Sequence, residues 1–235
     1  MIVVLTGAGI SADSGIATFR DSDGLWANYR IEDVCTPEAL VRNRAQVIEF
    51  YNIRRKELLE KEPNGAHIAL AQLEREQDVY IITQNIDDLH ERAGSKNIIH
   101  LHGELRKLRS SRNEMAIVPI EGWEQKLDAK HSDGSLLRPF VVFFGESVPM
   151  LERAIEITEK ADILVIIGTS LNVYPAASLV HYVRPDVPIY IVDPAVNNTD
   201  TAFNAPRISN PITYIAKRAV IGVPELVDRL LTKDL

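Results

Sequence analysis

The sequence has very little cysteine, no long apolar run and no excess of positive charge. Cys35 is the one cysteine among 235 residues, so the chain has no internal disulfide and no Cys-x-x-Cys pair to hold zinc or an iron–sulfur cluster. No apolar run approaches the roughly 18 residues of a membrane span. The 33 acidic residues outnumber the 26 basic ones, and a net charge of -7 has the wrong sign for nonspecific binding to phosphate backbones. We therefore expect neither a membrane nor nucleic acid among its partners.

The overall composition is that of a globular protein. A hydrophobic content of 46% over 235 residues allows one sizeable core and a small subdomain. Because the first predicted strand begins at Ile2, we expect no signal or transit peptide, and hence a cytoplasmic protein, which we expect to be a monomer. Cys35 lies near Glu32 and Asp33, and neighbouring acids raise the pKa of a thiol. A buried, unreactive cysteine is therefore favoured over a nucleophile.

Apolar runs rich in β-branched residues alternate with helical patterns along the chain. The runs lie at residues 2–6, 79–83, 98–101, 141–144, 163–167, 189–192 and 212–216. This alternation predicts an α/β fold with a mostly parallel sheet and helices on both faces.

Two intervals do not fit the alternation. Residues 21–63 contain no predicted strand but include an amphipathic helical stretch from Arg44 to Lys61, and residues 103–139 are polar and mixed in pattern. We predict that these two insertions pair into a small second domain. A cleft would separate it from a discontinuous large domain of residues 1–20, 64–102 and 140–235.

A glycine loop, Gly7-Ala8-Gly9-Ile10-Ser11-Ala12, directly follows the first predicted strand and is expected to open a helix. Glycine lets the backbone approach a ligand closely, and the N–H groups at a helix start favour a phosphate. The spacing fits the dinucleotide fingerprint. In a dinucleotide-dependent dehydrogenase, a second strand that ends in an acidic residue would follow. Here a loop-like segment from Thr18 to Trp26 follows instead. The pattern favours a bound dinucleotide but not hydride transfer.

Polar residues follow several of the predicted strands at their carboxyl ends, where this fold class binds ligands. They are Gln84, Asn85, Asp87, His102, Gly168, Thr169, Ser170 and Asp193. Asn85 alone could be a helix cap, and any one of these motifs could be an ordinary turn. His102 is the candidate general base, since it reaches a strand end beside Gly103. Together the residues are expected to meet in one crevice.

These motifs resemble those of a known family. In the order and approximate spacing of the sirtuins, the NAD-dependent protein lysine deacylases, the chain carries Gly7-Ala8-Gly9-Ile10-Ser11, Thr18-Phe19-Arg20, Gln84-Asn85-Ile86-Asp87, His102-Gly103, Phe144-Gly145-Glu146 and Gly168-Thr169-Ser170. The resemblance covers nearly the whole chain, and the motif set is highly specific. It implies a Rossmann-like large domain, a small domain built from the two insertions, and a substrate tunnel between them.

The resemblance also implies roles for these residues. His102 would be the catalytic base, with Asn85 and Asp87 completing the catalytic group. In sirtuins the acyl oxygen attacks C1′ of the ribose, nicotinamide leaves, and the histidine activates a ribose hydroxyl; the products are free lysine, nicotinamide and O-acyl-ADP-ribose. NAD would be bound by Gly7, Ala8, Gly9, Ser11, Ala12, Thr18, Phe19, Arg20, Gln84, Asn85, Ile86, Asp87, Gly168, Thr169, Ser170, Asp193 and Ala219.

An acylated lysine in a protein or peptide is the implied partner. Its backbone would pair edge-to-edge with the chain around residues 142–146 and 172–174, a mode that reads backbone more than sequence. The implied contact residues are Val142, Phe144, Gly145, Glu146 and Val173.

Tyr51 and Arg54 suggest which acyl group is preferred. Positions three apart share a helix face, so a phenol and a guanidinium would project together and could bind a carboxylate. The pair resembles the Tyr-x-x-Arg of the sirtuin class that removes succinyl, malonyl and glutaryl groups. The alternative is a structural face, with Tyr51 packed and Arg54 extended to water.

The sequence departs from its family at the zinc site. Sirtuins carry four zinc cysteines in the second insertion, where this chain has Ser110, Asn113, Lys130 and Asp133. Lysine is incompatible with a tetrahedral thiolate site, so we expect no zinc, although His131, Asp133 and Glu114 could in principle recruit a metal. We predict a zinc-free module held by packing and salt bridges, with a core of Trp123, Met115, Ile117 and Val118.

Two further departures concern the adenosine end of the implied NAD site. Asp193 stands where sirtuins more often have asparagine, and it can still accept hydrogen bonds from ribose hydroxyls. Lys217 stands where a glycine is expected before the segment at Ala219.

The sequence leaves three functions to compare. The main hypothesis is an NAD-dependent lysine deacylase that prefers acidic acyl groups. A mono-ADP-ribosyltransferase could use the same NAD site but would not need Tyr51 and Arg54. A degenerate NAD-binding protein is the third, and the presence of His102 argues against it, because a pure binder needs no base.

Overall fold

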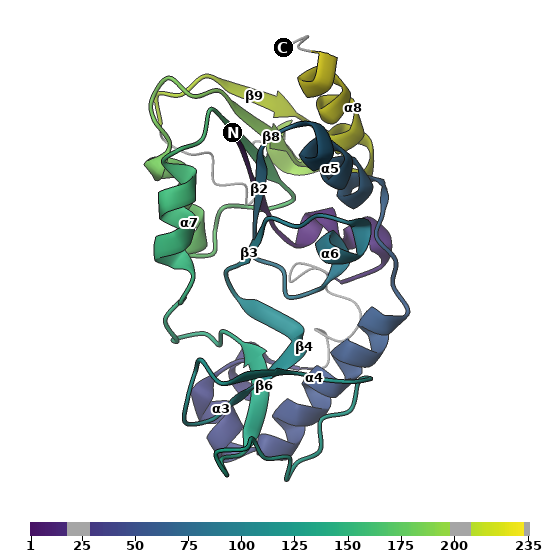
Figure 1. Cartoon of the computed structure of the whole chain (residues 1–235), viewed down its shortest axis with the longest axis vertical. Helices are drawn as coiled ribbons and strands as arrows, with labels where there is room; N and C mark the ends of the chain where they lie inside the picture. The colour runs from purple at the N-terminus through teal and green to yellow at the C-terminus, as the bar shows by residue number, and fades with distance from the viewer. Residues whose placement is uncertain (18–28, 198–207, 233–235) are drawn as a thin grey trace.

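The computed structural model describes residues 1–17, 29–197 and 208–232. Figure 1 shows two parts that follow each other along the longest axis of the molecule, each built around its own sheet. The N-terminus and α8, the last helix of the described residues, lie in the upper part, and the lower part is formed by internal segments.

The upper part contains six parallel strands in the order β3-β2-β1-β7-β8-β9. The chain starts in the middle of the sheet, builds one half and then returns to build the other, an order typical of dinucleotide-binding folds. The order reverses between β1 and β7, and this is where such sheets leave a crevice. Six of the seven predicted strands are confirmed. Their bounds are Ile2–Thr6 for β1, Val79–Thr83 for β2, Ile98–His100 for β3, Ile163–Ile167 for β7, Ile189–Val192 for β8 and Ile212–Ile215 for β9.

Helices cover both faces of this sheet, as predicted. On one side lie α5 (Gly65–Glu76) and α8 (Ala219–Thr232), with the short α6 (Leu89–Ala93) beside α5. On the other lie α7 (Leu151–Thr158) and the 3-10 helix η3 (Ala176–Tyr182). Successive strand residues alternate between the two apolar cores, so the continuous apolar run of β1 is buried along its whole length. We call this sheet and its helices the large-sheet region.

The helix predicted after the glycine loop is not formed. Two 3-10 turns, η1 (Ala8–Ile10) and η2 (Ala12–Ser14), follow β1, and Gly15, with φ of 80°, ends the second. A turn of three residues lacks the aligned peptide dipoles of an α-helix, so the helix-dipole argument for phosphate binding does not apply here. The loop contributes close backbone approach instead.

The lower part of the molecule contains an antiparallel sheet in the order β5-β4-β6. It packs against α2, α3 and α4, and we call these elements together the small-sheet region (Figure 1). The long helix α4 coincides with the predicted amphipathic stretch. The bounds are Ile31–Val34 for α2, Pro37–Arg42 for α3, Arg44–Leu59 for α4, Gly103–Ser110 for β4, Ile117–Pro119 for β5 and Leu137–Val141 for β6.

The prediction of a strand at residues 141–144 is wrong. The strand is β6, which ends at Val141 and pairs with β4 in the small sheet, antiparallel rather than parallel. After Val141 the backbone leaves the ladder: Phe144 N–H donates to the Cys35 carbonyl at 2.9 Å, and Gly145 has φ of 90°. Apolar side chains continue past the strand because they line a cavity, not because they extend the sheet.

The predicted core of the second insertion is also wrong. Met115 is 83% exposed, Ile117 and Trp123 are exposed, and Val118 is half-buried. The buried apolar side chains of the small sheet come from β4 and β6 instead: Leu105, Leu108, Leu137 and Val141.

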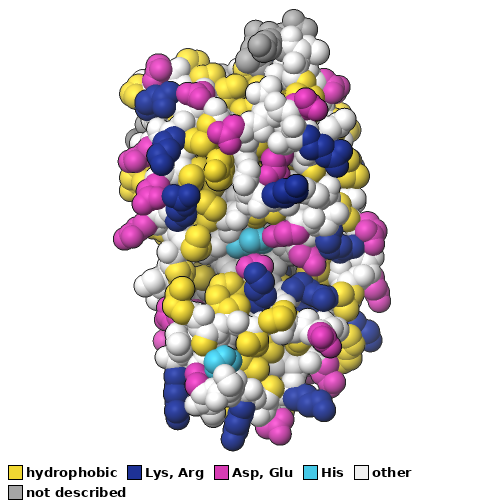
Figure 2. Space-filling view, in the orientation of Figure 1, with side chains coloured by type: hydrophobic (Ala, Val, Ile, Leu, Met, Phe, Trp, Pro, Cys, Tyr) yellow, Lys and Arg dark blue, Asp and Glu magenta, His cyan; other side chains and the backbone are white. Residues whose placement is uncertain are grey.

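Within the described part of the chain, no helix is both long and apolar enough to cross a membrane. Figure 2 shows one face of the molecule, on which acidic and basic side chains are interspersed among hydrophobic ones. The proposed domain boundaries, the cytoplasmic location and the monomeric state stay predictions.

Candidate active site

A cavity of about 1110 Å³ lies at the carboxyl ends of the central parallel strands and continues to α4 and the segment after β6. All the predicted site residues that the structure describes line it, whereas Thr18, Phe19 and Arg20 lie outside the described residues. The predicted cofactor and catalytic residues at the cavity are Gly7, Ala8, Gly9, Ser11, Ala12, Gln84, Asn85, Ile86, Asp87, His102, Gly168, Thr169, Ser170, Asp193 and Ala219. The predicted substrate residues there are Tyr51, Arg54, Val142, Phe144, Gly145, Glu146 and Val173.

Three glycines let the loops after β1 and β7 cross in direct contact. A Cβ on Gly9 would lie 2.6 Å from the Cα of Gly168, and one on Gly7 would lie 2.7 Å from the Cβ of Thr169. Gly168 has φ of 59°, and its own Cβ would meet the backbone nitrogen of Ile10 at 2.5 Å. Gly9 N–H donates to the Gly168 carbonyl at 2.9 Å. The glycines thus form a smooth backbone floor that no larger residue permits.

Asn85, Asp87 and Ser11 form a buried polar network beside this floor. The Asn85 amide donates to the Gly7 carbonyl and to the Ser11 hydroxyl, both at 3.2 Å, and the Ser11 hydroxyl donates to Asp87 Oδ2 at 3.0 Å. Burial raises the pKa of Asp87, against the hydrogen bonds from Leu89 N–H and Ser11. Asn85 is not a helix cap, since α6 begins at Leu89 with Asp88 at its N-cap. Its side chain ties the loop after β2 to the glycine loop.

His102 follows β3, and a contact between one of its ring nitrogens and a backbone carbonyl fixes the position of the ring. His102 Nδ1 lies 3.0 Å from the Gln84 carbonyl. A carbonyl only accepts, so Nδ1 carries the proton in this contact and Nε2 keeps its lone pair in the neutral ring. Burial lowers the pKa of His102, with the Gln84 hydrogen bond opposing it. The ring therefore stays neutral near pH 7, as a general base requires.

Tyr51 and Arg54 lie at the small-sheet end of the cavity. The Tyr51 ring is buried and stacks on Phe143 with a centroid separation of 5.8 Å, while its hydroxyl lies 3.5 Å from Cys35 Sγ. The Arg54 guanidinium lies 6.0 Å from the centre of the Tyr51 ring. Burial raises the pKa of Tyr51 well above its usual value, so it remains a neutral phenol and a hydrogen-bond donor.

Cys35 is buried, as predicted, but the pKa of its thiol is not raised by the acidic residues nearby in the sequence. Burial is the main cause that raises the pKa of its thiol, with the hydrogen bond to Tyr51 opposing it. A thiol of this kind is a packing group with a weak hydrogen bond rather than a nucleophile.

Glu146 shapes the segment after β6. Its carboxylate accepts from Arg138 Nη1 at 2.6 Å and from Phe143 N–H at 2.8 Å, and the Arg138 guanidinium lies 4.1 Å from the centre of the Phe143 ring. Two large apolar side chains that line the cavity are nevertheless exposed: Phe144 by 47% and Tyr174 by 63%. Exposed apolar surface at a cavity mouth is typical of a docking site.

Several cavity residues were not found from the sequence. Glu57, Leu58 and Lys61 continue the cavity face of Arg54 at helical spacing, a signal that the periodicity of α4 contained. Arg218 forms an ion pair with Asp13, and both line the cavity. Nothing in the sequence links two residues so far apart along the chain.

Three of the four positions aligned with zinc cysteines, Ser110, Asn113 and Asp133, belong to one hydrogen-bonded cluster, and Lys130 forms an isolated β-bridge with Leu136. The Ser110 hydroxyl donates to Asp133 Oδ2 at 2.6 Å, lies 2.7 Å from Ser135 Oγ and accepts from Asn113 N–H at 3.1 Å. The Ser110 hydrogen bond is the first of several that lower the pKa of Asp133. Hydroxyl, amide and ammonium groups do not supply the ligands of a structural zinc site, so these residues do not fit the metal. Among the described residues, the one group of three potential metal ligands is Glu91, His100 and Glu104.

The large-sheet end of the cavity does fit a dinucleotide. Its glycine floor admits close backbone approach, and its buried amide and carboxylate offer fixed polar groups, Asn85 and Asp87, in an otherwise largely apolar space. The cavity volume reaches the upper end of ligand pockets, which is about 1,000 Å³.

Known proteins resemble this chain over nearly its whole length. The sequence model described as the Sir2 family matches residues 7–175. An NAD-dependent protein deacylase of Aggregatibacter actinomycetemcomitans is 57% identical over 202 residues, which cover 86% of this chain and 95% of that protein. An NAD-dependent protein deacylase of Bacteroides thetaiotaomicron is 52% identical over 235 residues, which cover 98% and 97%.

Solved structures give the same answer. A Sir2 homologue mutant in complex with ADP-ribose has a TM-score of 0.86 at 39% identity and covers 99% of this chain and 92% of its own. A Sir2 homologue in complex with NAD has a TM-score of 0.83 at 39% identity, with coverages of 99% and 90%. Sir2 bound to acetylated peptide has a TM-score of 0.75 at 31% identity, with coverages of 100% and 93%. By sequence and by fold alike, the chain belongs to the Sir2 family, the sirtuins.

Proposed function

We propose that this sirtuin removes acidic acyl groups, of the succinyl, malonyl and glutaryl type, from lysine side chains of proteins. As a member of its family it is an NAD-dependent protein deacylase. The observation that carries the acyl preference is the position of Tyr51 and Arg54, which line the same cavity as His102 and the glycine floor.

The chemistry of this end of the cavity favours a carboxylate. Tyr51 is held by Cys35 and Phe143 as a neutral phenol, and Arg54 adds a guanidinium whose planar set of N–H donors matches a carboxylate. Charge-assisted hydrogen bonds to one carboxylate contribute about 1.5–3 kcal/mol, which corresponds to roughly ten- to a hundredfold in kcat/KM. An acetyl group makes no such contact.

His102 is proposed as the base and the loop after β2 as the part that orients the dinucleotide. Bound NAD supplies the ADP-ribose group that accepts the acyl group. Asn85 and Asp87 would hold the nicotinamide-ribose half with their buried amide and carboxyl groups, and the glycine floor would hold the phosphates. With its Nδ1 proton bound to the Gln84 carbonyl, His102 is ready to take a proton at Nε2.

The peptide is proposed to bind along the exposed apolar residues at the cavity mouth. Phe144 is 47% exposed and Val173 41% exposed, and both line the cavity. The solved structure of Sir2 bound to acetylated peptide supports an acylated peptide as the substrate of a closely similar fold. Acyl-lysine would then pass between the two regions toward His102.

The experiment is a comparison of acyl groups on one peptide. Turnover of acetyl-, succinyl-, malonyl- and glutaryl-lysine peptides is measured by mass spectrometry, with and without NAD, for wild type and Arg54→Met. We expect NAD-dependent loss of the acidic groups, and a fall in kcat/KM for them of roughly ten- to a hundredfold in Arg54→Met, because the guanidinium no longer pairs with the carboxylate. Acetyl turnover should change little.

Arg42→Met is the matched control, since Arg42 is an exposed arginine paired with Asp33 in the same region and does not line the cavity. Activity confined to acetyl-lysine would make Tyr51 and Arg54 structural residues. ADP-ribosylated protein without deacylation would favour the transferase, and NAD binding without any turnover would favour the degenerate binder.

A further inference from the structure

Two histidines hold two successive carbonyls of the loop after β2. His102 Nδ1 lies 3.0 Å from the Gln84 carbonyl, and His100 Nδ1 lies 3.1 Å from the Asn85 carbonyl. The loop that carries the buried amide and carboxyl of the site is therefore fixed from the β3 side at two adjacent peptide groups. His102 is accounted for by the proposed mechanism, whereas His100 is not.

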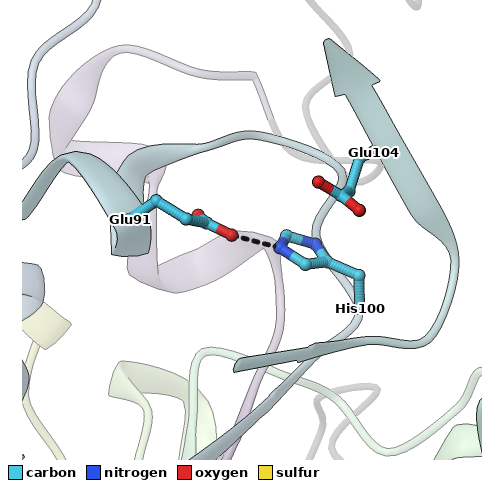
Figure 3. Close-up of side chains that lie close together, drawn as sticks. All are labelled: Glu91, His100 and Glu104. Atoms are coloured by element: carbon cyan, nitrogen blue, oxygen red, sulfur yellow. Dashed lines mark hydrogen bonds and ion pairs between the residues drawn. The ribbon is translucent and has the colours of Figure 1, made fainter. Parts of the chain in front are cut away.

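His100 differs from His102 in what its second nitrogen contacts. His100 Nε2 lies 2.6 Å from Glu91 Oε1, and Figure 3 shows Glu91 from α6 and Glu104 from β4 on two sides of the ring. A carbonyl and a carboxylate both only accept, so both nitrogens of His100 donate and the ring is an imidazolium. The His100 side chain is 8% exposed, so this charge is shielded from water.

We propose that His100 and Glu91 are positioning residues of the deacylation reaction: the charged ring, held by Glu91, fixes the Asn85 carbonyl and with it the orientation of the loop that binds NAD. The inference rests on the proposed role of this loop in the reaction. Asn85 transmits the effect, because its side chain donates to the Gly7 carbonyl while its own carbonyl is bound to His100.

Loss of one proton from His100 breaks this arrangement. A neutral imidazole has one N–H, so either the contact with Glu91 or the contact with the Asn85 carbonyl becomes two facing lone pairs. The Asn85 peptide is then free to turn away from the position that its side-chain contacts require. A misplacement of about 1 Å in a positioning element can lower turnover about a hundredfold.

The two histidines consequently predict opposite limbs of a pH profile. Burial opposes the charge on His100, but the hydrogen bond to Glu91 and the charges of Glu91 and Glu104 outweigh it and raise the pKa of His100. The other groups that face it are Asp87 in the loop and the neutral His90 on α6. Since burial lowers the pKa of His102, activity should rise with pH as His102 loses its proton and fall at higher pH as His100 loses its own.

A divalent metal is the competing occupant of this cluster. The ligand atoms of Glu91, His100 and Glu104 lie within 4.8 Å of one another. However, Glu104 is paired with Lys107 at 2.7 Å, and the short Glu91 contact already takes up His100 Nε2. The His100 ring nitrogen and the Glu104 carboxylate are thus already occupied by contacts within the chain, which favours the imidazolium over a bound metal.

The test is the pH profile of kcat/KM for the preferred acyl peptide in wild type, His100→Asn, His100→Leu and Glu91→Gln. The Asn side chain can still donate to the Asn85 carbonyl but does not titrate, so His100→Asn should keep activity within about tenfold and lose the high-pH limb. His100→Leu should lose about ten- to a hundredfold at all pH values. Glu91→Gln should shift the high-pH limb to lower pH, because the imidazolium loses its counter-charge.

Glu156→Gln, which changes an exposed carboxylate paired with Arg153, is the control and should leave the profile unchanged. Thermal unfolding of each variant separates misfolding from misplacement. An unchanged high-pH limb in His100→Asn, or a loss of wild-type activity in EDTA, would overturn the inference. Wild-type protein that is inactive on every acyl peptide would instead overturn the proposed function.

Discussion

The large-sheet region and the small-sheet region are held together by different kinds of contact. In the former, β1 is buried at all five positions, and its side chains alternate between two apolar cores. In the latter, an apolar core lies between the helices and the sheet, and buried side-chain hydrogen bonds in addition join α4 to the segments around it. Arg55 is 0% exposed and donates to the carbonyls of Leu105 at 2.9 Å and Trp123 at 2.8 Å. The large-sheet region is held mainly by packing, whereas the small-sheet region is also tied, meaning that buried side-chain hydrogen bonds join its segments.

Because the contacts differ, the two regions should be sensitive to different kinds of substitution. Close packing makes a region intolerant of added atoms, because its interior has no space for them. A network of side-chain donors and backbone acceptors is intolerant of a lost donor, because each buried acceptor left alone costs free energy. Added and removed groups should therefore have different effects in the two regions.

The largest expected effect comes from adding one methyl group to the packed loop crossing. In Gly168→Ala the new Cβ would lie 2.5 Å from the backbone nitrogen of Ile10, at a φ of 59°. We expect a loss of about 3–5 kcal/mol in the free energy of unfolding and weakened NAD binding, from the clash together with the cost of the left-handed backbone. Urea unfolding and calorimetric titration with NAD measure the two.

Gly134→Ala is the matched control in the small-sheet region. Gly134 has a similar φ of 79°, but a Cβ there would meet nothing within 4 Å. It should lose about 1–2 kcal/mol, the backbone cost alone. Equal losses in the two variants would mean that the loop crossing gives way more easily than close packing implies.

The second effect comes from removing the buried guanidinium of the tied region. Arg55→Leu keeps an apolar stem but leaves the carbonyls of Leu105 and Trp123 without their donor. We expect a loss of about 3 kcal/mol or more in unfolding free energy, because these acceptors stay buried. Arg153→Leu on α7 is the comparison: the Arg153 side chain is 52% exposed and should contribute less than about 1 kcal/mol. A stable Arg55→Leu protein would show that apolar packing suffices for the small sheet.

The smallest effect separates two neighbouring serines. Ser110→Ala removes the group that bonds Asp133, Ser135 and the backbone N–H of Asn113, and it should cost about 1–3 kcal/mol. Ser111→Ala changes an exposed side chain and should stay within about 0.5 kcal/mol. Chemical denaturation of both variants measures the difference, and a Ser110→Ala protein as stable as Ser111→Ala would remove the cluster from the contacts that hold this region.

The same contrast explains how much could be predicted from the sequence. A strand covered on both faces is a continuous apolar run, and such runs predicted six parallel strands at nearly their observed bounds. Because parallel strands end at one edge, residues such as Asn85, His102 and Gly168 could be expected in one cavity, and they line one. The apolar pattern of each strand, together with the parallel order of the strands, is therefore enough to predict this part of the fold and site.

The side-chain hydrogen bonds of the small-sheet region leave no comparable pattern in the sequence. Arg55 is one polar residue on an amphipathic helix, and nothing local distinguishes it from a solvated one; its carbonyl partners lie 50 and 68 residues further on. Met115 and Trp123 are large apolar residues that the sequence favours as core, yet both are exposed. Their backbone is held by hydrogen bonds instead: Met115 N–H donates to Asn113 Oδ1, and the Trp123 carbonyl accepts from Arg55. The run at residues 141–144 misled for a related reason, since it continues past β6 into the cavity wall.

The crossing between the two sheets has a consequence for motion. β3 ends at His100 and β4 begins at Gly103, so Leu101 and His102 alone join the sheets along this path. A Cβ on Gly103 would overlap the carbonyl oxygen of Phe140, and the His102 carbonyl accepts from Val142 N–H at 2.9 Å. We expect a backbone packed so closely on its neighbour to move little. If the two regions swing apart to admit a peptide, the proposed base sits at the point that is displaced least.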